Sequence, residues 1–181
     1  MTIASAEEVI AFWRDAGQDR WFKPDAGFDV QIRERFLGTH EAAAAGRLDE
    51  WQQTADGTLA LLILLDQFPR NIFRGMPRAF ATDSKALKIA EGAVENGRDR
   101  KVEASMRSFF YLPFMHSERL RDQERGLALY QELGDAEALK YAELHRDAIR
   151  RFGRFPHRNE ILGRQSTPEE IAYLEGGGFR G

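Results

Sequence analysis

Apolar residues recur at helical spacing along almost the whole chain, and this periodicity limits the possible folds more than any other feature. Near the start, Val9, Phe12 and Ala16 follow the spacing directly after Ser5 and Glu8, a pair typical of a helix start. No stretch shows the sustained alternation of apolar and polar residues that predicts strands. The chain is therefore predicted to be all-α, with antiparallel helical hairpins joined by short loops.

The length of the chain favours one domain. At 181 residues it can bury one sizeable core, whereas two independent domains would each be marginal. Apolar residues make up 43% of it, and thirteen phenylalanines and three tryptophans supply large rigid side chains for a packed interior. We expect a single domain over residues 1–181, with a frayed glycine-rich tail at 175–181.

Charge and cysteine content exclude several functional classes. The formal charge is −3 and the two signs are interleaved, which points neither to nucleic acid nor to a membrane surface. The absence of cysteine excludes disulfides, thiolate catalysis and cysteine-ligated metal sites. The first residues lack the pattern of a secretory signal, so a cytoplasmic protein is expected. The longest apolar run, 59–65, is too short to cross a bilayer.

The helix that carries this apolar run is predicted to start at Asp56 and to end at Pro69. Asp56 can accept a hydrogen bond from a backbone N–H at the helix start, and proline disfavours helical geometry in the residue before it. His40, on the preceding helix, is expected at the surface. Ser117 is expected to be the N-cap of a helix over residues 119–133, with Glu118 in its first turn.

Three strings of residues carry a family resemblance. They are LDQFPRNIFRG at 65–75, LPFMHSE at 112–118 and FGRFPHRN at 152–159, supported by FW at 12–13 and GRQSTPEE at 163–170. In this order the strings resemble the bacterial family known as domain of unknown function 924, over essentially the whole chain. The resemblance implies a tetratricopeptide-like, right-handed helical superhelix and implies no known reaction.

Candidate ligand-binding residues are the polar positions of the three strings, with no catalytic role attached. They are Asp66, Gln67, Arg70, Asn71, Arg74, His116, Glu118, Arg154, His157, Arg158 and Asn159. Because polar groups beside an apolar helix must be paired, a structural interpretation has Asp66 bonded to Arg70 or Arg74. In the functional interpretation, Arg70, Arg74 and Arg158 converge on an anionic ligand, since guanidinium groups suit carboxylate and phosphate.

Histidines suggest two kinds of chemistry. His116, Ser117 and Glu118 have the groups of a hydrolase, although their adjacency in sequence carries little weight. His116, His145, His157 and Glu118 could together hold a divalent metal, but their spacing is not that of a metal motif. We therefore expect no metal and no cofactor.

Three functions fit these residues. The first is a helical binding module that recognises a small anionic ligand or a peptide carboxylate through the arginine, histidine and asparagine cluster. The second is an enzyme, a hydrolase or a metal-dependent one, that uses His116 or His157 with Glu118. The third is a scaffold for a protein partner without a chemical site. The identity of a ligand and the oligomeric state do not follow from the sequence.

Overall fold

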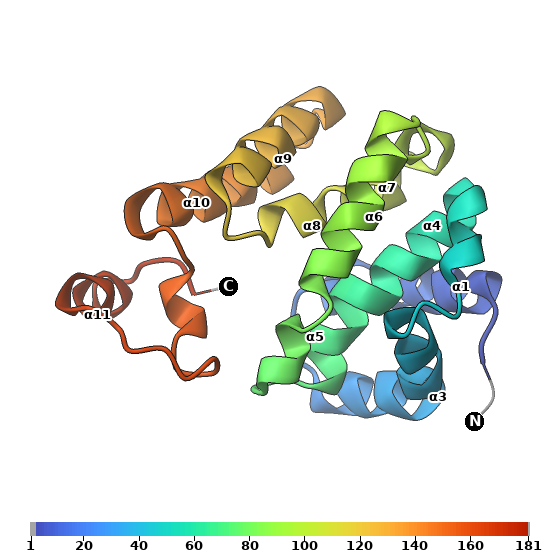
Figure 1. Ribbon diagram of the computed structural model, residues 1–181, viewed down its shortest axis with the longest axis horizontal. Helices are drawn as coiled ribbons and strands as arrows, with labels where there is room; N and C mark the ends of the chain where they lie inside the picture. Colours follow the sequence, from blue (N-terminus) through green and yellow to red (C-terminus); the bar gives the residue numbers. More distant parts are fainter. Residues whose placement is uncertain (1–2, 181) are drawn as a thin grey trace. The chain divides into compact units, whose positions relative to one another are not determined.

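The structure, a computed structural model, describes residues 3–180 and is built from helices (Figure 1). Within this range no residue lies in a strand, so the predicted all-α class is confirmed. The chain divides into two compact units, residues 1–113 and 114–181, here called unit 1 and unit 2. A single domain over 1–181 stays a prediction, and Met1, Thr2 and Gly181 lie outside the described residues.

Among the described residues, unit 1 contains four helices of eight residues or more and several shorter helical elements. Its elements are α1 (Ala6–Ala16), α2 (Gln18–Trp21), α3 (Ala26–Ala44), η1 (Asp49–Gln53), α4 (Ala55–Leu62), η2 (Ile63–Gln67), α5 (Phe68–Ile72), η3 (Pro77–Phe80), α6 (Asp83–Glu95), η4 (Asp99–Lys101), α7 (Ala104–Arg107) and η5 (Ser108–Phe110). A further short helix, α8 (Leu112–Met115), contains the boundary between the two units in the sequence. Helix α1 packs against α4, and α3 packs against α5.

Local sequence explains how these helices begin. The Ser5 hydroxyl accepts the Glu8 N–H while the Glu8 carboxylate accepts the Ser5 N–H at 2.7 Å, which confirms the predicted start of α1. The Asp25 carboxylate caps α3 by accepting the Phe28 N–H at 3.0 Å. Thr54, and not Asp56, caps α4, because its hydroxyl accepts the Gly57 N–H at 3.0 Å.

The most apolar helix continues through Pro69, so the predicted helix end is wrong. After α4 the backbone widens into the π-helical turn η2, and α5 follows without a break. The Phe68 N–H bonds five residues back, to Ile63. Because the Phe68 N–H bonds to Ile63, it does not serve the Leu64 carbonyl, and Pro69, which has no N–H, cannot serve the Leu65 carbonyl.

Two side chains from other helices supply the missing hydrogen bonds. His40 of α3 bonds through Nδ1 to the Leu64 carbonyl oxygen at 2.8 Å, and the Thr82 hydroxyl donates to the Leu65 oxygen at 2.6 Å. His40 is 3% exposed, so its predicted surface position is wrong. Burial lowers the pKa of His40, which favours a neutral ring whose Nδ1–H donates to this carbonyl. A helix interrupted by proline persists here because distant side chains satisfy its backbone.

Aromatic rings fill the core of unit 1. The fully buried large side chains include Trp13, Phe28, Phe36, Phe68 and Phe109. Trp13 of α1 stacks on Phe28 of α3 at 6.0 Å and meets Phe68 of α5 edge-on at 5.5 Å. These rings join three helices that are far apart in sequence, and such pairs add to the stabilisation from burial alone.

Unit 2 is built on a helical hairpin. Helices α9 (Leu120–Leu133) and α10 (Ala136–Phe152) pack side by side (Figure 1), joined at Gly134 in the left-handed conformation. The short turn η6 (Pro156–Arg158) and α11 (Pro168–Glu175) follow. Arg119, and not Ser117, is the N-cap residue of α9, so the predicted cap is wrong.

The start of α11 and the tail complete unit 2. Thr167 and Glu170 form a capping box at the start of α11. Beyond α11 the Phe179 side chain packs against a small core of Ala148, Ile149 and Phe155. Fraying of the tail stays a prediction. Throughout residues 3–180, no helix is both long and apolar enough to cross a membrane.

Candidate functional site

The predicted residues of unit 1 form carboxylate–guanidinium pairs. Asp66 is 1% exposed and lies 3.5 Å from the Arg70 guanidinium, which confirms the structural interpretation of this pair. Arg70 also donates to both carboxylate oxygens of Asp83, at 3.0 and 3.1 Å. Burial disfavours the charged guanidinium, but the charges of Asp66 and Asp83 outweigh this effect and raise the pKa of Arg70. Gln67 donates to Asp66 from the neighbouring position.

A second set of pairs ties the motif to α3. Asn71 donates to Asp29 at 2.8 Å, and Arg74 donates to both oxygens of the same carboxylate at 2.7 and 2.8 Å. Burial alone would raise the pKa of Asp29, but the hydrogen bonds from Arg74 and Asn71 hold it below its usual range. The bonds connect residues more than forty positions apart, so the motif fixes α3 in place.

In unit 2, Glu118 belongs to a partly buried ion pair with Arg164. It accepts hydrogen bonds from Arg164 at 2.7 and 2.9 Å and from the Phe155 N–H at 2.8 Å. Burial raises the pKa of this carboxyl, but the bonds from Arg164 and Phe155 have the greater effect and lower it. Glu118 therefore stays ionised near neutral pH, which is unsuited to a general acid.

Glu170 pairs with two polar residues of the third string, Arg154 and Asn159. Arg154 donates to its two oxygens at 2.7 and 2.9 Å, and Asn159 donates to it at 3.1 Å. The Arg154 bonds are the largest cause of a Glu170 pKa near 2, well below its usual range. Arg158 is buried, with its guanidinium 4.6 Å from the centre of the Phe155 ring. Glu170 was not among the predicted site residues, although it lies in the quoted family string.

The histidines of unit 2 cluster, but they do not form a hydrolase triad with Ser117. The Ser117 hydroxyl donates to Asp122 at 2.6 Å, and Glu118 is already paired. The ring centres of His116 and His145 are 6.2 Å apart, and His157 lies in ring contact with Phe155 at 5.5 Å. Among the described residues, no group of three histidine and carboxylate side chains is arranged to hold a metal ion. An enzymatic role stays a prediction.

The structure thus gathers the predicted residues within each unit. Five of them surround the Pro69 region of unit 1, and six lie around η6 and its flanking loops in unit 2. Four arginines at or beside the motif positions each make two hydrogen bonds to one carboxylate; they are Arg70, Arg74, Arg154 and Arg164. Direct contact of the predicted residues with a ligand stays a prediction.

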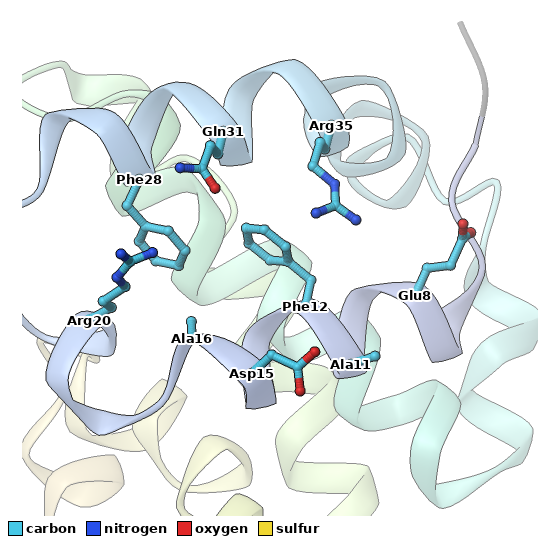
Figure 2. A pocket seen from close by; sticks show the side chains of 9 residues that line it. All are labelled: Glu8, Ala11, Phe12, Asp15, Ala16, Arg20, Phe28, Gln31 and Arg35. Atoms are coloured by element: carbon cyan, nitrogen blue, oxygen red, sulfur yellow. The ribbon is translucent and has the colours of Figure 1, made fainter.

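A groove in unit 1 was not predicted. It has a volume of about 380 Å³ and lies between α1 and α3, closed at one end by α2 (Figure 2). The lining residues are Glu8, Ala11, Phe12, Asp15, Ala16, Arg20, Phe28, Gln31 and Arg35. Phe12 and Phe28 form the floor, with stacked rings 5.5 Å apart.

Two arginines on the groove differ from the arginines of the motifs. The Arg35 guanidinium lies 4.6 Å from the centre of the Phe12 ring, and that of Arg20 lies 5.7 Å from the Phe28 ring. Neither guanidinium makes an ion pair or a hydrogen bond with any residue in the range 3–180. Both residues are exposed, so their N–H groups face solvent above an aromatic floor.

A sequence signal for this groove exists but is ambiguous. Its α1 lining follows the spacing i, i+3, i+4, i+7 and i+8 from Glu8 to Ala16, which is one face of a helix. That face combines two acidic residues, two alanines and one phenylalanine, so it resembles an ordinary boundary between core and solvent. Only the distance between α1 and α3 turns the face into a groove.

These features define an all-helical protein with carboxylate–arginine pairs at its motif positions and an aromatic groove in its first unit. The model of a family described as "Bacterial protein of unknown function (DUF924)" matches residues 9–178, and the chain belongs to this family. The resemblance inferred from the three strings is therefore confirmed. The tetratricopeptide-like arrangement that it implied stays a prediction.

One solved structure is similar over nearly its full length. It is that of ATU0120 from Agrobacterium tumefaciens, a protein of unknown function. The two chains are 49% identical, the match covers 95% of this chain and 97% of the other, and the TM-score is 0.92. No match to a curated protein was found.

Proposed function

We propose that the protein is a helical binding module whose α1–α3 groove takes an acidic peptide segment. The observation that supports this most directly is the contrast between two groups of arginines. Each motif arginine of unit 1 is matched to a carboxylate of the chain itself, whereas Arg20 and Arg35 lie over aromatic rings with no such partner in the described part of the chain. Guanidinium groups in that state are suited to the carboxylates of another molecule.

The form of the groove favours a peptide over a compact metabolite. Its lining follows α1 from Glu8 to Ala16, which corresponds to about 12 Å of helix. Ala11 and Ala16 present only methyl groups on this side of the groove (Figure 2), which leaves room for an apolar side chain of the peptide next to the Phe12 ring. Peptides bound in grooves between helices use this combination of apolar anchors and flanking charges.

Charge sets the orientation of the bound segment. Arg35 and Gln31 are on α3, whereas Glu8 and Asp15 are on α1 (Figure 2). Glu8 is engaged with the Ser5 N–H, so it attracts a ligand less than Asp15 does. The peptide would therefore direct its carboxylates toward Arg20 and Arg35, and any basic group toward Asp15.

The motif residues act in this proposal by positioning the groove. Asn71 and Arg74 hold Asp29 on α3, and His40 of the same helix bonds to the η2 turn. These bonds fix the helix that carries Phe28, Gln31 and Arg35. We further propose a cytoplasmic protein whose partner is a peptide and not a nucleic acid, because the groove carries acidic as well as basic side chains.

Selection from a displayed library of short random peptides would test the groove. We expect peptides retained by the wild-type protein to be enriched in aspartate and glutamate next to an apolar residue. The double variant Arg20→Glu/Arg35→Glu should instead retain peptides rich in lysine and arginine. Affinity for a selected acidic peptide should fall about tenfold in this variant, since two exposed ion pairs are lost.

Arg47→Glu is the matched control, because Arg47 is also exposed in unit 1 but does not line the groove. This variant should select acidic peptides like the wild type. Selection without a preference for acidic residues, or with the same preference in the double variant, would contradict the proposal. Circular dichroism should confirm that both variants are folded.

A further inference from the structure

The segment that follows α11 turns back and places the Phe179 ring among three other rings of unit 2. The centre of the Phe179 ring lies 4.2 Å from that of His145, 5.3 Å from that of His157 and 6.4 Å from that of Phe155. His157 and Phe155 both meet this ring edge-on. His145 comes from α10, His157 from η6 and Phe155 from the position before η6. The helical hairpin and the turn that follows it therefore hold these three rings, here called the box.

Specific contacts produce this return of the tail. The Phe179 N–H donates to the Tyr173 hydroxyl at 2.9 Å, and the Gly178 N–H donates to the Tyr173 carbonyl at 2.8 Å. A Cβ added to Gly178 would lie 2.6 Å from two atoms of the Tyr173 ring, so only glycine fits at this approach. The tail is therefore shaped to deliver Phe179 to the box.

The segment that carries Phe179 is nevertheless easy to release. Gly176, Gly177 and Gly178 precede it, and glycine loses more conformational freedom on ordering than any other residue. The Phe179 side chain is only partly buried, and Arg180 beyond it is exposed. A ring held on such a tether can be exchanged for another ring that binds the box better.

The box also contains a polar atom whose hydrogen bond is missing. His157 Nδ1 is buried and has no hydrogen-bond partner among the described residues. Burial and the neighbouring Arg158 charge lower the pKa of His157 to about 4, so its ring is neutral at pH 7. A phenylalanine cannot satisfy this nitrogen, whereas a hydroxyl group serves either tautomer because it both donates and accepts.

We propose that the His145–Phe155–His157 box is a binding site for a para-substituted phenol, which displaces Phe179 and hydrogen-bonds to His157 Nδ1. The ring of the ligand takes the place of the Phe179 ring, and its hydroxyl group forms the hydrogen bond that the buried His157 Nδ1 lacks. The phenol is either a free small molecule or the side chain of a tyrosine in a partner. This site is independent of the groove in unit 1.

Titration by NMR with four probes tests the proposal. The probes are 4-methylphenol and N-acetyltyrosinamide, each with its analogue that lacks the hydroxyl, toluene and N-acetylphenylalaninamide. We expect a phenol to shift the wild-type amide signals of Gly178 and Phe179 as the tail leaves. Phe179→Ala should bind the same phenol about tenfold more tightly, because no ring then competes for the box.

The difference in affinity between each phenol and its analogue without the hydroxyl distinguishes a specific phenol site from an apolar cavity. In Phe179→Ala the phenol should bind about tenfold more tightly than its analogue, which corresponds to about one hydrogen bond. His157→Phe in the same background should remove this preference and retain binding of toluene. Stronger binding of N-acetyltyrosinamide than of 4-methylphenol would identify a tyrosine side chain as the ligand, and the reverse order would identify a free phenol.

Two results would overturn the proposal: no movement of the tail signals with either phenol, or equal affinity of each phenol and its analogue for Phe179→Ala. If Phe179→Ala does not fold, Gly178→Ala replaces it, because the added Cβ displaces the tail and leaves all the rings of the box intact.

Discussion

At the scale of single residues, the burial of His145 makes the stability of the protein depend on pH. Its side chain lies on α10 and is 9% exposed, and its Nδ1 hydrogen-bonds to the Tyr141 carbonyl oxygen at 2.7 Å. Burial, with a smaller effect of His116, lowers the pKa of His145 from 6.5 to about 3. Below pH 6.5 the unfolded chain therefore binds a proton that the folded chain does not.

We predict that the free energy of unfolding falls as the pH is lowered from 6.5 toward 4, by about 1.4 kcal/mol per pH unit for this residue. The stabilisation is fully present above pH 6.5, because both states are then neutral. Urea unfolding of the wild type and of His145→Gln between pH 4.5 and 7.5 would measure it. The variant should show the shallower dependence, and parallel curves would refute the assignment.

At the scale of elements, two helical glycines of unit 1 should respond to alanine in opposite directions. A Cβ on Gly57 of α4 would collide with the Trp51 carbonyl oxygen and lie 2.8 Å from the Thr54 hydroxyl. A Cβ on Gly92 of α6 would meet nothing within 4 Å. We predict that Gly57→Ala destabilises the protein by about 1–3 kcal/mol, whereas Gly92→Ala stabilises it by about 0.5–1 kcal/mol.

Urea unfolding of both variants measures these changes, and each variant is the control for the other. Both variants replace a helical glycine of unit 1 by alanine, so the change in helix propensity contributes equally to both. A stabilising Gly57→Ala would mean that the close approach of η1 to α4 relaxes without cost. A destabilising Gly92→Ala would mean that something other than a steric clash of the added Cβ opposes alanine at this position of α6.

Local sequence predicts these helices well where their ends depend on neighbouring residues, as the two capping boxes show. It fails at Pro69 because the hydrogen bonds that rescue the helix come from His40, 24 residues before Leu64, and Thr82, 17 residues after Leu65. The candidate site has the same limit. The Asp66–Arg70 pair is one helical turn apart and was predictable, whereas the partners Asp29 and Asp83 come from separate helices.

At the scale of the whole molecule, the division into two units raises the question of whether they unfold together. The sequence predicts a single domain, and a single cooperative domain unfolds in one transition. All three tryptophans, Trp13, Trp21 and Trp51, lie in unit 1, so tryptophan fluorescence follows that unit alone. Far-ultraviolet circular dichroism follows the helices of both units.

We predict that fluorescence and circular dichroism give the same unfolding midpoint in urea. A conservative change in the core of unit 2 makes the test sharper. Ile149 is 3% exposed, and Ile149→Val should destabilise its surroundings by about 1 kcal/mol without preventing folding. If the chain is one domain, this change lowers the fluorescence midpoint, which reports on unit 1, as much as the circular dichroism midpoint. A fluorescence midpoint that does not move would mean that each unit unfolds by itself, because the lost methylene group then affects only the unit that contains it.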